Sequence, residues 1–490
     1  MFWHNARSRK SQKRWLNLMR GLVLVGLIWG LSAPVHAPNM AYAENSASCA
    51  PEWTLIPSAN TDSPGHVLND AVALSANNVW AVGTYWGLSD PQALIEHWDG
   101  NQWQIIEGAD LNAPISQLGA VDASSTDVWI LGGVHDGVTG SALLEHWDGV
   151  SWSSIPITET TGVNALKVIS DTDIWVVGGK ILHWDGANWT TTEIPLIGNE
   201  ARTLNSIHAF AENDIWAVGS FSDYDEVNDI ETVSTLTLHY DGTDWQIVPS
   251  PNPNPTWNVL ASVHGTSPSD LWAVGQSNGY KINTRPLILH WDGVTWSSAT
   301  NLNPSAREDA LSDVFATSLN RATAVGYYTN ANNQVRPLVM EWDGTAWTQR
   351  DTGTTKFASN TFKAVSAGAD RVIWAVGVST TNTSNQITLS ERFAAPIAKP
   401  SNLLPAKGTV APKTRVKLDW SDAQCATRYE VVVHQDSKNG VLADSASNLA
   451  ASKYKTIALP KGHTYYWRAR GCVDDVCGKW SKWYNFTLQP

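Results

Sequence analysis

Apolar and polar positions alternate in a unit that repeats along most of the chain. A short apolar strand with a Trp and a closing Gly first appears at Asn78-Val-Trp-Ala-Val-Gly83. It returns at 127–132, 173–178, 214–219, 270–275, 321–326 and 372–377, with Thr323 in place of the Trp in one copy. The residues at the Trp position are 49, 46, 41, 56, 51 and 51 residues apart. Self-similarity at this period, in units of short strands, predicts a β-propeller with one four-stranded blade per unit.

A second motif, an aromatic-Asp-Gly turn followed by Trp, accompanies every copy but the last. It first occurs at His97-Trp-Asp-Gly100 with Trp103. The seventh copy ends at 387–393 without this motif, whereas the segment 52–58 resembles the outer strand at 244–250. We therefore predict an all-β fold, a seven-bladed β-propeller at residues 50–393 that the N-terminal strand closes. An open solenoid would instead leave both end pieces unpaired.

The first residues have the pattern of an export signal. Six Lys and Arg and no acid precede an apolar run at 21–32, which is shorter than the roughly 20 residues of a spanning helix. Ala41-Tyr-Ala43 offers a cleavage site, so we expect a signal peptide at residues 1–43 and a secreted, extracellular product. An uncut membrane anchor is the alternative, and Val35-His-Ala37 is a second possible cleavage site. Cleavage would leave 27 Lys and Arg against 46 Asp and Glu, a net charge of −19, which disfavours nucleic acid as a partner.

Four cysteines are compatible with an oxidising compartment. Cys472 and Cys477 can close a small loop, and this is the pair we favour. Cys49 and Cys425 then either pair with each other or stay free.

The repeats stop before a short connector, residues 394–400, and the remaining residues, 401–490, alternate as strands of a two-sheet sandwich. The expected strands include 416–420, 429–433, 465–469 and 480–486. On Trp420, Tyr429, Leu459 and either Tyr465 or Tyr466 this part resembles a fibronectin type III domain. The resemblance implies a spacer or adhesive module, and another immunoglobulin-like sandwich remains an alternative.

Two classes of connection should have constant length, and two should vary. The turns after the first and third strands of each unit are uniform and share one face, because consecutive strands run antiparallel. The inserts after the second strand, up to the long stretch 220–234, and the unit-to-unit connections vary and share the other face. Variable loops on a rigid scaffold are typical of binding sites. The candidate ligand-binding residues there are Tyr85, Trp86, Tyr224, Trp257, Tyr280, Tyr327 and Tyr328.

Aromatic faces beside polar side chains suit a glycan or an extended peptide. We expect a non-catalytic binding protein, more readily than an enzyme, with an extracellular glycan or protein as its ligand. The alternatives are a polysaccharide-active enzyme, a glycoside hydrolase or lyase with Asp223 or Asp309 at the central mouth, and a purely structural envelope component. We assign no catalytic residue, and we expect no membrane contact once the signal is cut.

Several motifs favour structural roles. The repeat tryptophans are expected to fill the spaces between blades, and the aspartates of the Asp-Gly turns to form those turns. The histidines at 97, 146, 183, 239 and 290 occur one per blade, so they should bond to nearby turns rather than converge on a metal. The acidic stretch 223–229 lacks the Gly and terminal Glu of an EF-hand, and we expect neither a metal nor a cofactor.

The turn Asp292-Gly-Val-Thr-Trp296 resembles the Asp-box of sialidases and related propellers, although it lacks the residue between Asp and Gly. The whole repeat region resembles secreted bacterial propellers built on Val-Trp-Ala-Val-Gly repeats. Neither resemblance implies a defined reaction, since Asp-boxes are structural in that family.

Overall fold

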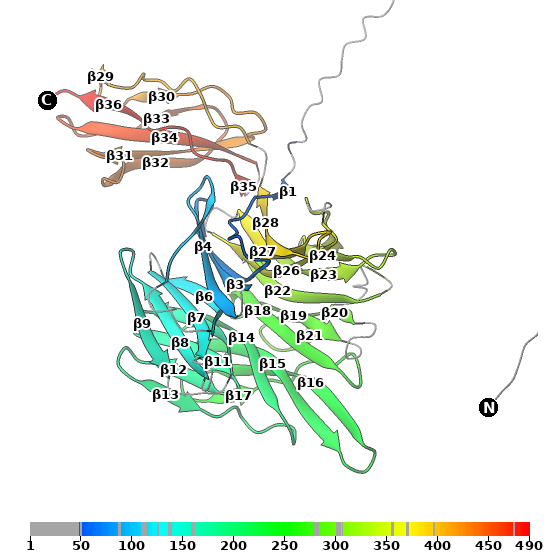
Figure 1. The fold of residues 1–490 in the computed structure, drawn as a ribbon. Coiled ribbons are helices and arrows are strands. Elements are labelled where there is room, and N and C mark those ends of the chain that lie inside the picture. The colour runs from blue at the N-terminus through cyan, green and yellow to red at the C-terminus, as the bar shows by residue number, and fades with distance from the viewer. Residues whose placement is uncertain are drawn as a thin grey trace, which may run out of the picture. The chain divides into compact units, whose positions relative to one another are not determined.

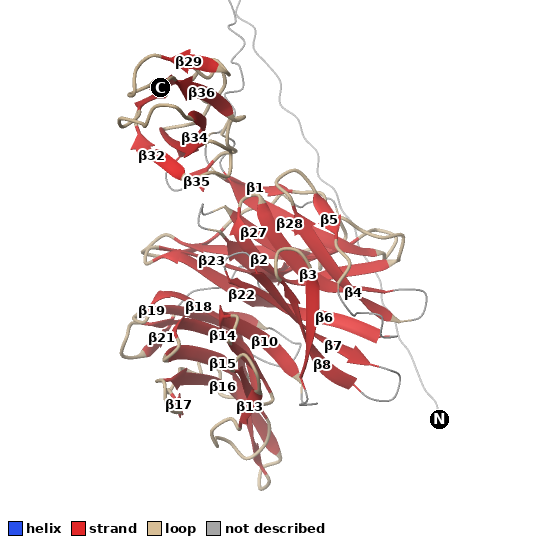
Figure 2. Cartoon of the chain, turned by 90° about the vertical axis from the view of Figure 1, so that its left-hand side faces the viewer, coloured by secondary structure: helices blue, strands red, loops and turns tan. Residues whose placement is uncertain are grey.

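A computed structural model describes residue 49 and residues 51–86, 90–108, 115–124, 127–135, 140–157, 162–277, 284–299, 305, 307–353, 357–368, 372–394, 397–473 and 476–490. The expected signal peptide lies outside these residues. The described residues form strands, turns and loops, as Figures 1 and 2 show. They contain no helix long and apolar enough to cross a membrane.

Within the described residues, seven four-stranded antiparallel sheets follow one another, a propeller-like arrangement. We number them in chain order by their innermost strands, and the first six are each continuous in sequence. Sheet 1 contains β2 (Gly65–Ser75), β3 (Asn78–Trp86), β4 (Pro91–Trp98) and β5 (Trp103–Ile105). Sheet 2 contains β6 (Ile115–Ser124), β7 (Asp127–His135), β8 (Gly140–Trp147) and β9 (Trp152–Ile157). Sheet 3 contains β10 (Val163–Ser170), β11 (Asp173–Gly178), β12 (Ile181–Trp184) and β13 (Trp189–Thr192).

The next three sheets have the same strand order. Sheet 4 contains β14 (Arg202–Ala211), β15 (Asp214–Asp225), β16 (Ile230–Tyr240) and β17 (Trp245–Ile247). Sheet 5 contains β18 (Asn258–Ser267), β19 (Asp270–Ser277), β20 (Arg285–Trp291) and β21 (Trp296–Ser298). Sheet 6 contains β22 (Asp309–Ser318), β23 (Arg321–Thr329), β24 (Val335–Trp342) and β25 (Trp347–Gln349).

Sheet 7 combines the two ends of the repeat region. Its strands β26 (Ser359–Ala367), β27 (Ile373–Thr380) and β28 (Gln386–Ala394) come from the last repeat, and β1 (Glu52–Leu55) is its outer strand. β1 runs antiparallel to β28, with Trp53 opposite Phe393. The innermost strands contact one another in chain order, and β26 contacts β2. The pairing of β1 with β28 is the one that the sequence predicts.

The repeat tryptophans are buried where one sheet faces the next, as predicted. The ring of Trp216, 2% exposed, packs on Trp291 and Trp296 of sheet 5 at centroid distances of 4.9 and 5.7 Å. Trp374 of sheet 7 contacts Trp98 and Trp103 of sheet 1 in the same way, at 5.0 and 5.5 Å. The same aromatic contact therefore recurs from sheet to sheet, including the junction where the chain's ends meet.

The C-terminal part has two sheets of its own. One contains β29 (Thr409–Ala411), β31 (Arg428–Gln435), β32 (Leu442–Leu449), β34 (Thr464–Val473), β35 (Val476–Cys477) and β36 (Tyr484–Leu488). The other pairs β30 (Lys417–Asp419) with β33 (Lys453–Lys455). Of the residues singled out in the sequence, Trp420, Tyr429, Leu459 and Tyr465 are buried, and Tyr466 is half-buried. The last strand begins at Tyr484 and not at Trp480, and the guanidinium of Arg468 lies over the rings of Trp480 and Trp483 at 4.7 and 4.4 Å.

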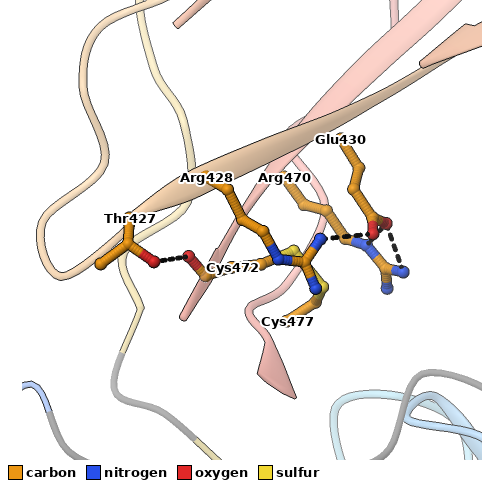
Figure 3. Close-up of a disulfide and its surroundings, with 6 residues drawn as sticks. All are labelled: Thr427, Arg428, Glu430, Arg470, Cys472 and Cys477. Carbon is orange, nitrogen blue, oxygen red and sulfur yellow. Dashed lines mark hydrogen bonds and ion pairs between the residues drawn. A yellow bond between two sulfur atoms is a disulfide. The ribbon is translucent and has the colours of Figure 1, made fainter. Parts of the chain in front are cut away.

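Two disulfides involve all four cysteines. Cys472 pairs with Cys477, the pair favoured from the sequence, beside the carboxylate of Glu430 and its partners Arg428 and Arg470 (Figure 3). Cys49 pairs with Cys425, 376 residues away. This disulfide links the segment before β1 directly to the C-terminal part.

Candidate functional site

The sheets have two rims that differ in regularity. We call the rim with the turns after the first and third strands the constant rim, and the opposite rim the variable rim. The turn from third to fourth strand has the same length in sheets 1 to 6, for example from Trp98 to Trp103 and from Trp342 to Trp347. On the variable rim, the connection after the second strand ranges from Gly178–Ile181 to Ser277–Arg285. The expected division into uniform and varied connections is confirmed.

Each aspartate of the Asp-Gly turns between the third and fourth strands accepts two backbone N–H bonds. In sheet 5, Asp292 Oδ1 accepts from the amides of Val294 and Thr295, both at 2.8 Å. The following Gly293 has a φ of +92°, which favours glycine. These bonds hold the pKa of the Asp292 carboxyl below its usual value. The aspartates are turn formers, as predicted.

Four of the five repeat histidines bond to the residue that starts the second strand of their own sheet. His239 Nε2 lies 2.8 Å from Asp214, and His97, His183 and His290 bond alike to Asn78, Asp173 and Asp270. In sheet 2 the distance from His146 to Asp127 is 3.6 Å. Ligand atoms of His146, Asp127 and the exposed Asp171 lie within 4.8 Å of one another, so these three could hold a metal.

The long insert expected at 220–234 is mostly strand and not loop. β15 and β16 continue their pairing from Ser220–Thr235 to Asp225–Ile230, which extends sheet 4 as a hairpin beyond its neighbours (Figure 1). The expectation of a loop was wrong because apolar residues continue along both strands: Phe221 packs against the core between sheets 3 and 4, and Val233 is buried. The carboxylate of Asp225 caps the hairpin turn by accepting bonds from Val227 and Asn228.

The candidate residues Tyr85 and Trp86 lie at the end of β3, on the variable rim of sheet 1. The ring of Tyr85 stacks on His66 at 5.9 Å, and His66 is 1% exposed, so burial lowers its pKa. Trp86 is 41% exposed and lies over Gly65, where a Cβ would come within 2.9 Å of Cε3. The backbone of a glycine thus supports an accessible indole ring.

The candidate residues Tyr224 and Trp257 lie on the rim of sheets 4 and 5. The hydroxyl of Tyr224 donates to Asp229, and its backbone is held on both sides by Asn199. Trp257 forms a β-bridge with Val233 of the hairpin. The two residues are therefore attached to the same extended hairpin, whereas Tyr280 lies outside the described residues.

Tyr327 and Tyr328 are consecutive residues of β23 in sheet 6, half-buried and on opposite faces of the strand. Tyr328 pairs with Asp309, whose buried carboxylate accepts from Ser305 and lies 3.9 Å from Arg285. Asp309, a carboxylate considered for catalysis, is 0% exposed, and Asp223 accepts from the amide of Asn199. Both acids hold loops of the rim.

The described candidate residues thus share a rim but do not converge on one point. Tyr85 and Trp86 belong to sheet 1, and the others to sheets 4, 5 and 6. The rim can therefore offer several separate aromatic contacts to an extended ligand. These residues do not form one deep pocket for a compact ligand.

A central cavity of about 340 Å³ is lined by the innermost strands of all seven sheets. Its polar side chains bond to the next sheet: Asp70 accepts from Val121, Asp313 from Val365, and Ser366 from Ala73. These bonds form a belt around the cavity. Asp70 and Asp313 each come directly after a β-bulge in their innermost strand, between Leu68 and Asp70 and between Leu311 and Asp313.

Burial changes the pKa values of the groups around this cavity. It raises the pKa of Asp313 to about 6, and that of Asp70 well above its usual value, with the charge of Asp313 adding to the second shift. Burial also lowers the pKa of His264 to about 3. Asp122, in contrast, forms a 2.5 Å ion pair with Lys167. Sequence reasoning missed this cluster, although Asp70 and Asp313 occupy the same place in their repeats, eight residues before the apolar strand begins, while Asp122 lies five residues before it.

No family model and no curated protein match this chain. Among solved structures it is similar to a YCF48 bound to D1 peptide, at 15% identity over 69% of this chain and 97% of that one, with a TM-score of 0.45. It is also similar to YCF48 from Cyanidioschyzon merolae, at 12% identity over 70% and 98%, TM-score 0.46. A PL25 ulvan lyase bound to -[GlcA(1-4)Rha3S]- matches at 12% identity over 70% and 94%, TM-score 0.41.

Proposed function

We propose that the chain is a secreted binding protein with a seven-bladed β-propeller at residues 50–393, a connector at 394–400 and a fibronectin type III-like domain at 401–490. Two disulfides support an oxidising compartment, as does the signal pattern at residues 1–43. The pairing of β1 with β28 supports closure of the propeller by its N-terminal strand.

The propeller binds an extracellular glycan or protein through its variable rim, without catalysis. The observation that carries this proposal is Trp86, the one aromatic side chain among the exposed large hydrophobic residues of the described chain. An exposed indole costs hydrophobic free energy in a free protein, and stacking on a sugar or peptide recovers it. The other described rim aromatics provide further contacts along an extended ligand.

A polysaccharide-active enzyme is the second candidate, and the cavity supports it. Asp313, with a pKa of about 6, could donate a proton near neutral pH. Its two oxygens, however, already accept bonds from Ser262, Val314 and Val365. A role in holding sheets together accounts for these contacts, and catalysis would need one of them to be released.

The test is a glycan and peptide array screened with the full chain, run beside a polysaccharide-cleavage assay. Trp86→Ala should abolish binding of any ligand found and Trp86→Phe should restore part of it, whereas Asn101→Ala on the constant rim should change nothing. Binding that survives Trp86→Ala but not Asn101→Ala would place the site on the other rim. Cleavage that Asp313→Asn abolishes would favour the enzyme instead.

A further inference from the structure

A groove of about 590 Å³ in the C-terminal domain is lined by two short segments, 411–417 and 453–455. Part of its lining is apolar, formed by Ala411, Pro412, Val416 and Tyr454. The hydroxyl of Tyr454 donates to the carboxylate of Asp444, 3.0 and 3.1 Å from its two oxygens, which fixes the position of the ring. A volume of several hundred Å³ is typical of ligand sites.

Every charged residue that lines this groove is a cation. The five are Lys413, Arg415, Lys417, Lys453 and Lys455, all of them exposed. Within the described part of the chain, Lys417 alone of these has an ion-pair partner, Asp419 at 2.6 Å. The whole chain has a formal net charge of −13, so this concentration of positive charge is opposite to the chain's general character.

Two of the lysines face each other across a strand pair. Lys417 of β30 lies directly opposite Lys455 of β33, and Lys453 lies opposite Asp419. Like charges at directly opposed positions destabilise a sheet. Asp419 compensates the charge of Lys417 in part, and an anion placed beside Lys455 and Lys453 would reduce the repulsion that is left.

We propose that this groove binds an anionic polysaccharide, whose carboxylate or sulfate groups meet the cations while a sugar ring lies on the apolar lining. An anionic bilayer would be a poorer fit, because the site is concave. Duplex nucleic acid requires a long basic footprint, which a chain of net charge −13 does not favour. The site lies outside the propeller, so the inference is independent of the function proposed for the variable rim.

The test measures retention of the full chain on polygalacturonate, which carries carboxylates, and on dextran sulfate, with neutral dextran as the blank. At low salt we expect binding to at least one polyanion, weakening as salt rises because counterions are released on binding. The double variant Lys417→Gln/Lys455→Gln should weaken binding at least tenfold and reduce the salt dependence. Lys438→Gln/Lys461→Gln changes two exposed lysines of the same domain outside the groove, and should bind as the parent does.

The polyanion that is retained distinguishes carboxylate from sulfate recognition. Failure to bind either, or equal loss with the two double variants, would overturn the proposal. Tighter binding to duplex DNA or to anionic vesicles would replace the polysaccharide by that partner. Thermal melting checks that each variant is folded, and Trp86→Ala, which tests the rim, should leave retention on the polyanion unchanged.

Discussion

The two rims of the repeated sheets are made by the same chain but follow different rules. On the constant rim, one turn recurs with the same length, the same glycine and the same aspartate bonds, as Asp99 and Asp292 illustrate. On the variable rim, the buried carboxylate of Asp309 accepts a bond from Ser305, while the carboxylate of Asp225 caps an exposed hairpin turn. An interaction repeated in sheets 1 to 6 holds the scaffold, whereas an interaction found once is available for recognition. This contrast predicts which substitutions will damage folding and which will damage binding.

The largest effect should follow removal of the strand that completes sheet 7. Deleting residues 50–58 exposes the edge of β28 and removes Trp53, which is 6% exposed and packs on Phe362 and Phe393. We expect a lower Tm and aggregation, measured by calorimetry and size-exclusion chromatography, because an unpaired edge pairs with other chains. Shortening the hairpin of sheet 4 around Asp225 is the matched change on the variable rim and should leave both readouts unchanged. Equal Tm values for the deletion and the parent would contradict the closure.

The second largest loss of stability should follow removal of a tryptophan ring packed between two sheets. Trp216→Ala should lower the free energy of unfolding by roughly 3–5 kcal/mol, since a large buried aromatic is removed and a cavity remains. Urea denaturation measures this. A loss below about 1 kcal/mol would show that the ring does not contribute to the core.

The pH dependence of stability should reveal a buried glutamate of sheet 1. Burial raises the pKa of Glu96 from 4.5 to about 8, and its carboxylate accepts from Ser58, which follows β1. Because the folded state holds this proton more tightly, the contribution of Glu96 to stability is complete below about pH 4.5 and is lost as pH rises to about 8. Glu96→Gln should flatten the decline of Tm over this interval, an effect of up to a few kcal/mol. The exposed Glu107→Gln is the control, and an unchanged slope in Glu96→Gln would contradict the assignment.

An aspartate of the constant rim should have a smaller effect, at acid pH. Bonds from Thr345 and Ala346 lower the pKa of Asp343 to about 2. Its contribution is therefore present above about pH 3.8 and is lost as pH falls towards 2. Asp343→Ala should lower Tm at neutral pH and reduce its fall on acidification. Asp225→Ala should do neither, because opening the tip of the sheet 4 hairpin is a local event.

The smallest effect on stability is expected for Trp86. Its side chain is 41% exposed, so Trp86→Ala should change the free energy of unfolding by less than about 1 kcal/mol while it abolishes rim binding. Urea denaturation beside the array measurement separates the two. A loss as large as that of Trp216→Ala would make Trp86 part of the core and remove the main support for the binding proposal.

Much of the fold could be predicted from the sequence because the same local contacts repeat. Each Trp-x-x-Gly strand and each Asp-Gly turn specifies its own hydrogen bonds within a few residues, so the burial of Trp216 and the role of Asp292 follow from the pattern. Even the long-range pairing of β1 with β28 was accessible, because 52–58 has the character of an outer strand without a sheet. The extension of β15 and β16 was missed, because residues 222–232 are mostly polar or acidic and only the structure shows that they continue to pair.

Only the tertiary structure determines which charged side chains lie close together. Asp70, Asp122 and Asp313 lie on different sheets, and a cavity surrounded by seven innermost strands brings them together. The pairing of β30 with β33 likewise places Lys417 opposite Lys455, 38 residues away in the chain. Local propensity and hydrophobic periodicity thus determined the strands and their turns. The electrostatic sites arise where distant strands meet, because the energy of two charges depends on the distance between them in space and on their burial.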